Sequence, residues 1–219
     1  MKKTILASIL CAAIVADASA GKAVVIQDPH RDPAAQEFKS APVQKGAGFS
    51  PFQLSLVTPV QLPPQDWDVG GLALNILYGT SCNFKGLAIG GIANRATGRA
   101  DGLLIAPVAN VVDGDSNSFQ ISLVNFTKFA LTGMQLGAVN VAAFDENAGG
   151  EAFQLGVLYN FADSISGAQI SLINQAGYVK GFQLGLMNFA GDMMGVQIGL
   201  INIIGSKDLP FVPIINARF

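Results

Sequence analysis

Residues 195–202 read Gly-Val-Gln-Ile-Gly-Leu-Ile-Asn, and this phrase recurs along the chain. The copy before it occupies residues 181–188, with Gln and Asn at the same two places. Three earlier copies keep Gln and Asn five residues apart, a looser one pairs Gln154 with Asn160, and two more, ending at Asn94 and Asn110, lose the Gln. A fixed period predicts a fold built from repeats. The recurring Asn residues stand at positions 94, 110, 125, 140, 160, 174, 188, 202 and 216, and the last five are 14 apart.

Two kinds of side chain alternate within each copy. Val196, Ile198 and Leu200 have one parity, whereas Gln197 and Gly199 have the other. Alternation with period two is typical of a β-strand. A helix is disfavoured because Gly recurs in mid-segment, where it costs ~1 kcal/mol relative to Ala. Each copy is therefore predicted to form a strand with one wholly apolar parity.

Charged residues are confined to the joints between copies. Turn-forming residues occupy positions 162–164, 190–192 and 205–208, and almost every charge after Phe52 lies in such a joint, with Arg218 the clear exception. Only 13% of the residues are charged, against about 25% in soluble domains. After the N-terminal region, the sequence contains no run of ~20 apolar residues, which is the length that a membrane-spanning helix needs. Uncharged strands without a spanning helix favour a transmembrane β-barrel over a soluble β-domain, whose outer strands normally carry a polar face.

The predicted fold is all-β: an antiparallel β-barrel of about 10–12 short strands over residues 51–219. Joints of five or six residues suit antiparallel hairpins. Residues 21–50 are polar and proline-bearing, which predicts a flexible N-terminal arm. A β-solenoid is the alternative fold, because identical phrases also suit in-register stacking.

The first 20 residues have the form of a secretory signal peptide. Lys2 and Lys3 make the basic start, residues 5–15 are apolar, and an Ala-x-Ala site predicts cleavage near Ala20. The expected location is the bacterial outer membrane or cell surface.

The barrel assigns a side to each parity of the repeat. The Gln parity is expected to face the lumen, at Gln120, Gln135, Gln154, Gln169, Gln183 and Gln197. The apolar parity is expected to face lipid, at Phe182, Leu184, Leu186, Val196, Ile198 and Leu200. Phe219, a terminal aromatic residue, is expected to act as the C-terminal insertion signal. An equally weighted interpretation of the Gln residues is that they pair with one another to satisfy a buried face.

The sequence offers little for catalysis or cofactor binding. His30 is the only histidine and lies in the arm, which excludes a Ser-His-Asp or Cys-His arrangement in the repeats. Cys82 is the only cysteine after the signal peptide. Asp113 and Asp115 could bind calcium, although Asp is also common in turns. We therefore expect no enzyme activity, no metal, no cofactor and, with a formal net charge of −2, no nucleic-acid partner.

The tandem Gly-x-Gln-x-Gly-x-x-Asn units, with residues 59–62, residues 71–79 and the Pro-Phe-Val-Pro-Ile-Ile-Asn ending, resemble the bacterial surface-repeat proteins. That family consists of predicted outer-membrane proteins, and the resemblance covers residues 52–219. It implies a surface location and no catalytic residues. Residues 183–190 are also similar to the curlin repeat of secreted fibres, whose rungs stack in parallel.

Three functions follow from these patterns. The leading expectation is an outer-membrane surface protein with a structural or pore-type role, porin-like in fold. Its expected partners are outer-membrane lipid and the barrel-insertion machinery. Further copies of itself are also expected, because the apolar end of the inward parity cannot line a wide aqueous channel and would need a neighbour to cover it. The first alternative is a secreted β-solenoid or fibre-forming adhesion protein. The second alternative is a soluble periplasmic lipid-binding barrel.

Overall fold

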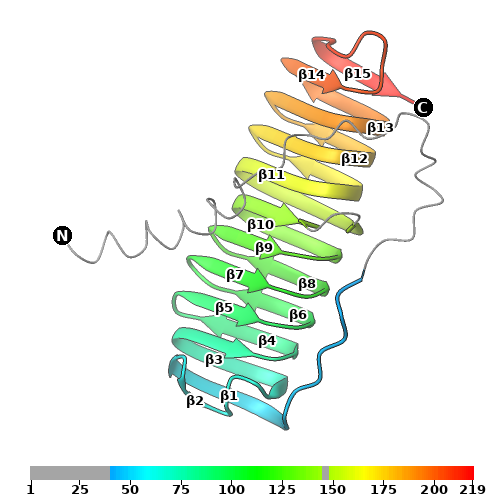
Figure 1. The fold of residues 1–219 in the computed structure, drawn as a ribbon. Coiled ribbons are helices and arrows are strands. Elements are labelled where there is room, and N and C mark those ends of the chain that lie inside the picture. Colours follow the sequence, from blue (N-terminus) through cyan, green and yellow to red (C-terminus); the bar gives the residue numbers. More distant parts are fainter. Residues whose placement is uncertain (1–39, 145–147) are drawn as a thin grey trace.

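A computed structural model describes residues 40–144 and 148–219 of the chain, so the predicted signal peptide and most of the arm lie outside the described residues. The described part is a β-solenoid, a rod in which the repeats stack as rungs along one axis (Figure 1). Its strands are β1 (Phe49–Val57), β2 (Val60–Leu62), β3 (Asp68–Ser81), β4 (Phe84–Gly90), β5 (Ala93–Ala96), β6 (Ala100–Ile105), β7 (Ala109–Val112), β8 (Ser116–Ile121), β9 (Val124–Thr127), β10 (Leu131–Ala142), β11 (Gly150–Ile170), β12 (Ile173–Leu184), β13 (Met187–Gly199), β14 (Ile201–Ile204) and β15 (Ile214–Arg218).

Each rung consists of two strand-like arms joined by a bend. The first arm carries the Gln position of the repeat and the second arm carries the Asn position. In the rung that contains β8 and β9, the bend lies at Ser122 and Leu123. Strand β10 runs through both arms, because it pairs with β8 through its first half and with β9 through its second half. The chain thus coils once per repeat.

Stacking is parallel and in register along the rod. Gln135 lies beside Gln120 on one side and beside Gln154 on the other, and Asn140 lies between Asn125 and Asn160 in the same way. The same pairing continues through β11, β12, β13 and β14. The rungs from β8 to β13 therefore place Gln above and below Gln, and Asn above and below Asn.

The predicted antiparallel β-barrel is wrong, and with it the outer-membrane-barrel and porin-like interpretations and the lipid-binding-barrel alternative. The chain bends inside the Gln-to-Asn phrase, not only between phrases, so that one predicted strand becomes two arms. Residues 162–164 and 190–192, which were expected to be hairpin turns, lie within β11 and β13. The physical reason is the side-chain amides: parallel, in-register strands stack equal residues ~4.8 Å apart, a spacing at which amides can bond to one another.

Two apolar clusters fill the interior beside the amide columns. One lies toward the N-terminal end and contains Val69, Ala73, Phe84, Ala88, Ala96, Ala100, Leu104 and Val112. The other lies toward the C-terminal end and contains Leu131, Ala142, Ala152, Ala162, Ile165, Ala176, Val179, Ala190, Met193 and Ile204. Alanine predominates because the two arms of a rung are close together, so that large side chains fit only at scattered places.

Antiparallel strands cover both ends of the rod (Figure 1). At the N-terminal end β2 pairs with β1, and at the C-terminal end β15 pairs with β13. Asn216, the last member of the 14-residue series, thus lies in the end strand and is not a further rung. Arg218 holds β15 in place through an ion pair with Asp192 and a hydrogen bond to Ser206. These end strands occupy the edges to which a further rung would otherwise add.

Residues 40–48 lie beside the bends between rungs at the N-terminal end. The backbone N–H of Ala41 donates to Asp115 Oδ1 (3.0 Å), and Gln44 Nε2 donates to the carbonyl of Thr97 (2.9 Å). The N–H of Gly46 donates to Asp68 Oδ2 (3.3 Å). This last part of the predicted arm is therefore bonded to the rod.

Candidate functional site

An uninterrupted ladder of asparagine side chains occupies one side of the interior. The Nδ2 of each Asn donates to the Oδ1 of the next Asn toward the C-terminus, over 2.7–3.1 Å. Most Nδ2 groups also donate to a backbone carbonyl at a bend, as Asn174 does to Leu184. The ladder thus both joins the rungs and closes the bends. Its members are Asn75, Asn94, Asn110, Asn125, Asn140, Asn160, Asn174, Asn188 and Asn202.

A glutamine ladder follows the other side of the interior. The Nε2 of each Gln donates to the Oε1 of the Gln before it, over 2.7–3.1 Å, so this ladder runs opposite to the Asn ladder. All six of these Gln side chains, from Gln120 to Gln197, are fully buried. In the low polarity of an interior such chains of amides polarise one another, and their hydrogen bonds become costly to break.

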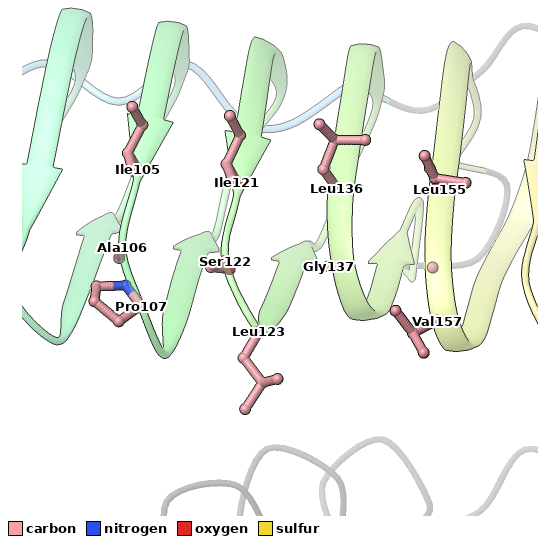
Figure 2. A pocket seen from close by; sticks show the side chains of 11 residues that line it. Ile105, Ala106, Pro107, Ile121, Ser122, Leu123, Leu136, Gly137, Leu155 and Val157 are labelled. Carbon is pink, nitrogen blue, oxygen red and sulfur yellow. The ribbon is translucent and has the colours of Figure 1, made fainter.

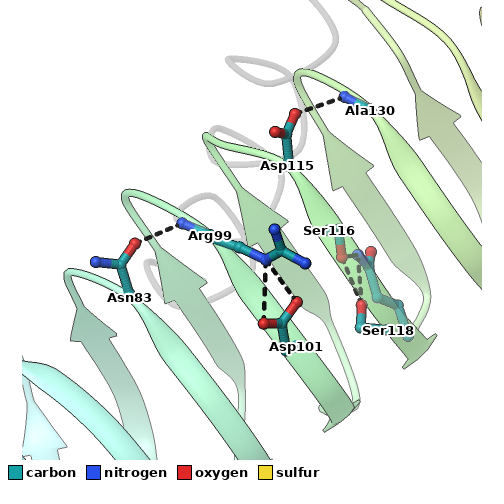
Figure 3. A network of polar contacts seen from close by, with 8 residues as sticks. Asn83, Arg99, Asp101, Asp115, Ser116, Ser118 and Ala130 are labelled. Carbon is teal, nitrogen blue, oxygen red and sulfur yellow. Dashed lines mark hydrogen bonds and ion pairs between the residues drawn. The ribbon is translucent and has the colours of Figure 1, made fainter. Parts of the chain in front are cut away.

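The N-terminal end of the Gln ladder is closed by hydroxyl groups. In the three preceding rungs the Gln position holds Ala73, Ala88 and Leu104, which cannot accept a hydrogen bond. Gln120 Nε2 donates instead to Ser116 Oγ (3.0 Å), and also to Ser118 and Thr127 of its own rung. Figure 3 shows Ser116 and Ser118 facing this amide. The rung of β8 and β9 is therefore polar inside and separates the two apolar clusters.

The C-terminal end of the Gln ladder is not closed in this way. Gln197 Oε1 is buried and accepts no hydrogen bond. The side chain opposite it on β15 is Asn216, whose Nδ2 donates to the carbonyls of Pro210 and Asn202. An unpaired buried acceptor costs about 1–3 kcal/mol. Gln197 is thus the weakest member of the ladder.

Two small-residue columns allow the rungs to approach. The leading Gly of the repeat has a positive φ in seven rungs, for example +138° at Gly181 and +150° at Gly195. A Cβ at Gly181 would collide with the carbonyl oxygen of Gly167 in the rung before. At the bend, the same position holds Gly185 and Gly199 in two successive rungs and Ser171 in the rung before them, and Ser171 Oγ donates to Asn174 Oδ1 (2.9 Å). The sequence shows these glycines as part of the repeat, but the positive φ of the leading Gly is seen only in the structure.

The outward side of the first arm is apolar along the whole rod. Each of nine rungs presents two apolar side chains, one on each side of the Gln position. Five of the eighteen are exposed, among them Phe119 (53%) and Ile121 (40%), and the others are half-buried. No charged residue interrupts these two columns. We name this surface the apolar face. It comprises Leu72, Leu74, Leu87, Ile89, Leu103, Ile105, Phe119, Ile121, Met134, Leu136, Phe153, Leu155, Ala168, Ile170, Phe182, Leu184, Val196 and Ile198.

A further apolar row lies at the bends beside this face. Figure 2 shows Ile105, Ile121, Leu136 and Leu155 side by side across successive strands, with a second row at the bends that includes Leu123. The two rows border a shallow groove of about 810 Å³. The exposed members of the bend row include Leu77, Ile92, Leu123, Val157, Leu172, Leu186 and Leu200.

The predicted site residues have the two expected parities, one inward and one outward. The inward residues, however, fill a packed interior and do not line a lumen. The six Gln side chains lie in the buried ladder, where they bond to one another and not to lumen water. Phe182, Leu184, Val196 and Ile198 lie on the apolar face, while Leu186 and Leu200 lie in the bend row. Phe219 follows β15 and is exposed (93%). The lumen and lipid roles depended on the barrel and are withdrawn with it.

Several charged residues of the described region have structural partners. Asp113 accepts hydrogen bonds from Arg95 Nε (2.8 Å) and from its Nη2 (2.6 Å). Asp115 Oδ1 accepts from the backbone N–H of Ala130 (3.2 Å; Figure 3). In residues 40–144 and 148–219 there is no group of three or more His, Cys, Asp or Glu side chains that could hold a metal ion.

Cys82 is the free thiol of the described region and lies buried near Asp68. Burial, and next the negative charge of Asp68, raise the pKa of this thiol above its ordinary value of 9.0. Burial likewise raises the pKa of Tyr159 above 10.0. Both groups are therefore held in their protonated forms near neutral pH.

Together these features define a class of protein: a parallel β-solenoid with amide ladders inside and an apolar face outside. Comparison with protein-family models, with curated proteins and with solved structures gave no match to this chain. Within the described residues, none of the secondary structure is a helix of the length and apolarity needed to cross a membrane.

Proposed function

We propose that this chain is a secreted structural protein of the cell surface, whose rod presents an extended apolar face for adhesion and assembly. The observation that carries this proposal is the apolar face itself, continuous over nine rungs and free of charge. Monomeric soluble proteins rarely expose contiguous apolar patches larger than a few hundred Å², and larger patches mark sites of interaction.

The interior supports a structural role. Two opposed amide ladders tie successive rungs together, and each rung contacts only its neighbours. Such an arrangement yields a rod whose shape is set by stacking and whose surface repeats with the rungs. A repeating surface is suited to extended contact more than to the recognition of a single small molecule.

The proposed location at the cell surface is supported by the predicted signal peptide and by the resemblance to surface-repeat proteins. Both are features of the sequence. The exposed apolar side chains agree with a cell-surface location, because a secreted protein can bind another cell-surface molecule or an apolar material through such a face.

Adhesion of cells that produce the protein tests this proposal. We expect intact cells to expose the protein to added protease and to bind an alkyl-coated surface more strongly than cells from which the gene is deleted. Replacing Phe119 and Leu155 with Ser should reduce this binding, since both lie on the apolar face. Replacing Leu209 with Ser is the matched control and should not reduce binding, because Leu209 is exposed in the loop before β15 and lies off the apolar face.

Retention of the protein inside the cell, or adhesion that is equal in all four strains, would overturn the proposal.

A further inference from the structure

The apolar face is large enough to hold a protein partner. Nine rungs spaced ~4.8 Å apart extend over roughly 40 Å, and the two columns with the bend row span about 15 Å. This gives about 600 Å² on one copy and about 1,200 Å² for a pair, at the lower limit of specific stable interfaces. The face is also bordered by a polar column on the same side of the sheet, which includes Lys85, Asp101 and Lys180. An apolar centre with a polar rim is typical of protein interfaces.

The two ends of the rod are covered by strands, so a second copy is more easily accommodated along the side of the rod than at its ends. Strand β2 covers part of the N-terminal edge and β15 pairs along the C-terminal edge. Addition of a second copy end to end would require these strands to move. The apolar face needs no such change.

We infer that the apolar face is the interface between two copies of this chain, packed sheet against sheet. This inference rests on the assembly part of the proposed function. A paired copy covers its apolar face, and a copy released when the pair dissociates presents the face for adhesion. A second copy fits because its ridges have the same ~4.8 Å spacing along the rod, so that side chains of one face can enter the spaces of the other over its full length. Neither a disordered peptide nor a lipid surface offers this periodic match.

Two-fold symmetry locates the centre of the interface. In a closed pair of fully overlapping rods, the middle rung of one copy meets the middle rung of the other. The middle rung of the nine is β10, with Met134 and Leu136 on the outward side. Residues at this rung therefore lie close to their own counterparts in the partner, whether the two rods run parallel or antiparallel.

Sedimentation velocity of the purified secreted chain without detergent tests the inference. We expect a dimer that dissociates on dilution. Replacing Ile121 and Leu136 with Asp should weaken the dimer by about 100-fold, since two charges would be buried at the centre of the interface. The control replaces Leu209 with Asp. Leu209 is exposed in the loop before β15 and lies off the apolar face, so this change should leave the dimer intact.

A second variant guards against loss of the fold. The Leu136→Cys protein should form a disulfide-linked dimer on mild oxidation, whereas Leu209→Cys and the parent should not, because Cys82 is buried. A circular-dichroism spectrum and melting curve like those of the parent would show that the solenoid is kept.

Several outcomes would overturn the inference. These are a monomer at all concentrations, a dimer that the two Asp substitutions leave unchanged, a monomer that co-sediments with phosphatidylcholine vesicles, and a monomer that dimerises only when residues 21–39 are removed. The last two would assign the face to lipid or to the chain's own N-terminal segment. Adhesion of cells in spite of a monomeric protein would leave the proposed function in place and reject only the pairing.

Discussion

Gln197 donates a hydrogen bond to Gln183 across 2.7 Å, yet its own Oε1 accepts none. Gln183 is bonded on both sides, because its Nε2 also donates to Gln169 Oε1. The ladder thus runs in one direction and ends on an unsatisfied acceptor. Two chemically identical residues, one rung apart, should therefore contribute unequally to stability.

The first prediction compares these two positions. Replacing Gln183 with Met removes a donor and an acceptor in mid-ladder: Gln169 Oε1 loses its donor, and Gln197 Nε2 keeps only the carbonyl of Ile203 as acceptor. We expect a loss of about 2–4 kcal/mol in the free energy of unfolding. Replacing Gln197 with Met also removes the unpaired oxygen, so its cost should be smaller by at least ~1 kcal/mol. Urea titration followed by circular dichroism measures both, and equal losses would contradict the assigned direction of the ladder.

The second prediction concerns charge inside the Asn ladder. Asn174 is fully buried and donates to Asn188 Oδ1 and to the carbonyl of Leu184. In the Asn174→Asp protein, Asn160 and Ser171 still donate to one carboxylate oxygen. The other oxygen would face both acceptors without a donor, and burying this ionised group costs at least ~3 kcal/mol at neutral pH. Burial raises the pKa of such a carboxyl in the folded state. The protein should therefore regain stability as the pH falls toward 4, while the parent shows no such gain in thermal melts.

The third prediction separates the two glycine columns. Gly181→Ala introduces a Cβ at a positive φ and against the carbonyl of Gly167, so we expect a loss of about 2–3 kcal/mol in unfolding free energy. Gly185→Ser should cost less than Gly181→Ala. A Cβ at Gly185 would also meet a carbonyl oxygen, that of Ser171, but Gly185 has no positive φ, and Ser171 itself shows a serine at this place one rung earlier that bonds to Asn174. Chemical denaturation of the two variants provides the comparison, and a tolerated alanine at position 181 would argue against the tight approach of the rungs.

The fourth prediction is a fall in stability at alkaline pH. Burial, with Asp68 second, raises the pKa of Cys82 in the folded protein above the 9.0 of a free thiol. The folded state therefore binds the proton more tightly than the unfolded state. The stabilisation that comes from this tighter proton binding is complete below pH 9, and it is lost as the pH rises through the higher pKa of Cys82 in the folded state. Melting temperatures between pH 7 and pH 10.5 should decline less steeply for Cys82→Ala than for the parent, and parallel curves would show that this thiol does not contribute.

The sequence by itself determined the repeat, the strand character of its two halves and the division between the Gln parity and the apolar parity. These follow from the spacing of residue types such as Gln183 and Asn188, because alternation with period two reports which side chains share a side of a strand. The pairing of Gln with Gln was among the alternatives that the residues themselves allowed. Gly181 was visible as part of the motif, but its positive φ and its approach to the rung before were not.

Only the tertiary structure decided how the strands pair. A period of two is the same in parallel and antiparallel sheets, so Gln197 and Ile198 alternate equally well in a barrel and in a solenoid. The choice depends on where the chain bends, and the bends at Ser122 and Gly199 lie inside the phrase that the sequence presents as one strand. The amide ladders stabilise the parallel stack only after distant rungs come together, and this long-range gain is not contained in any single copy of the repeat.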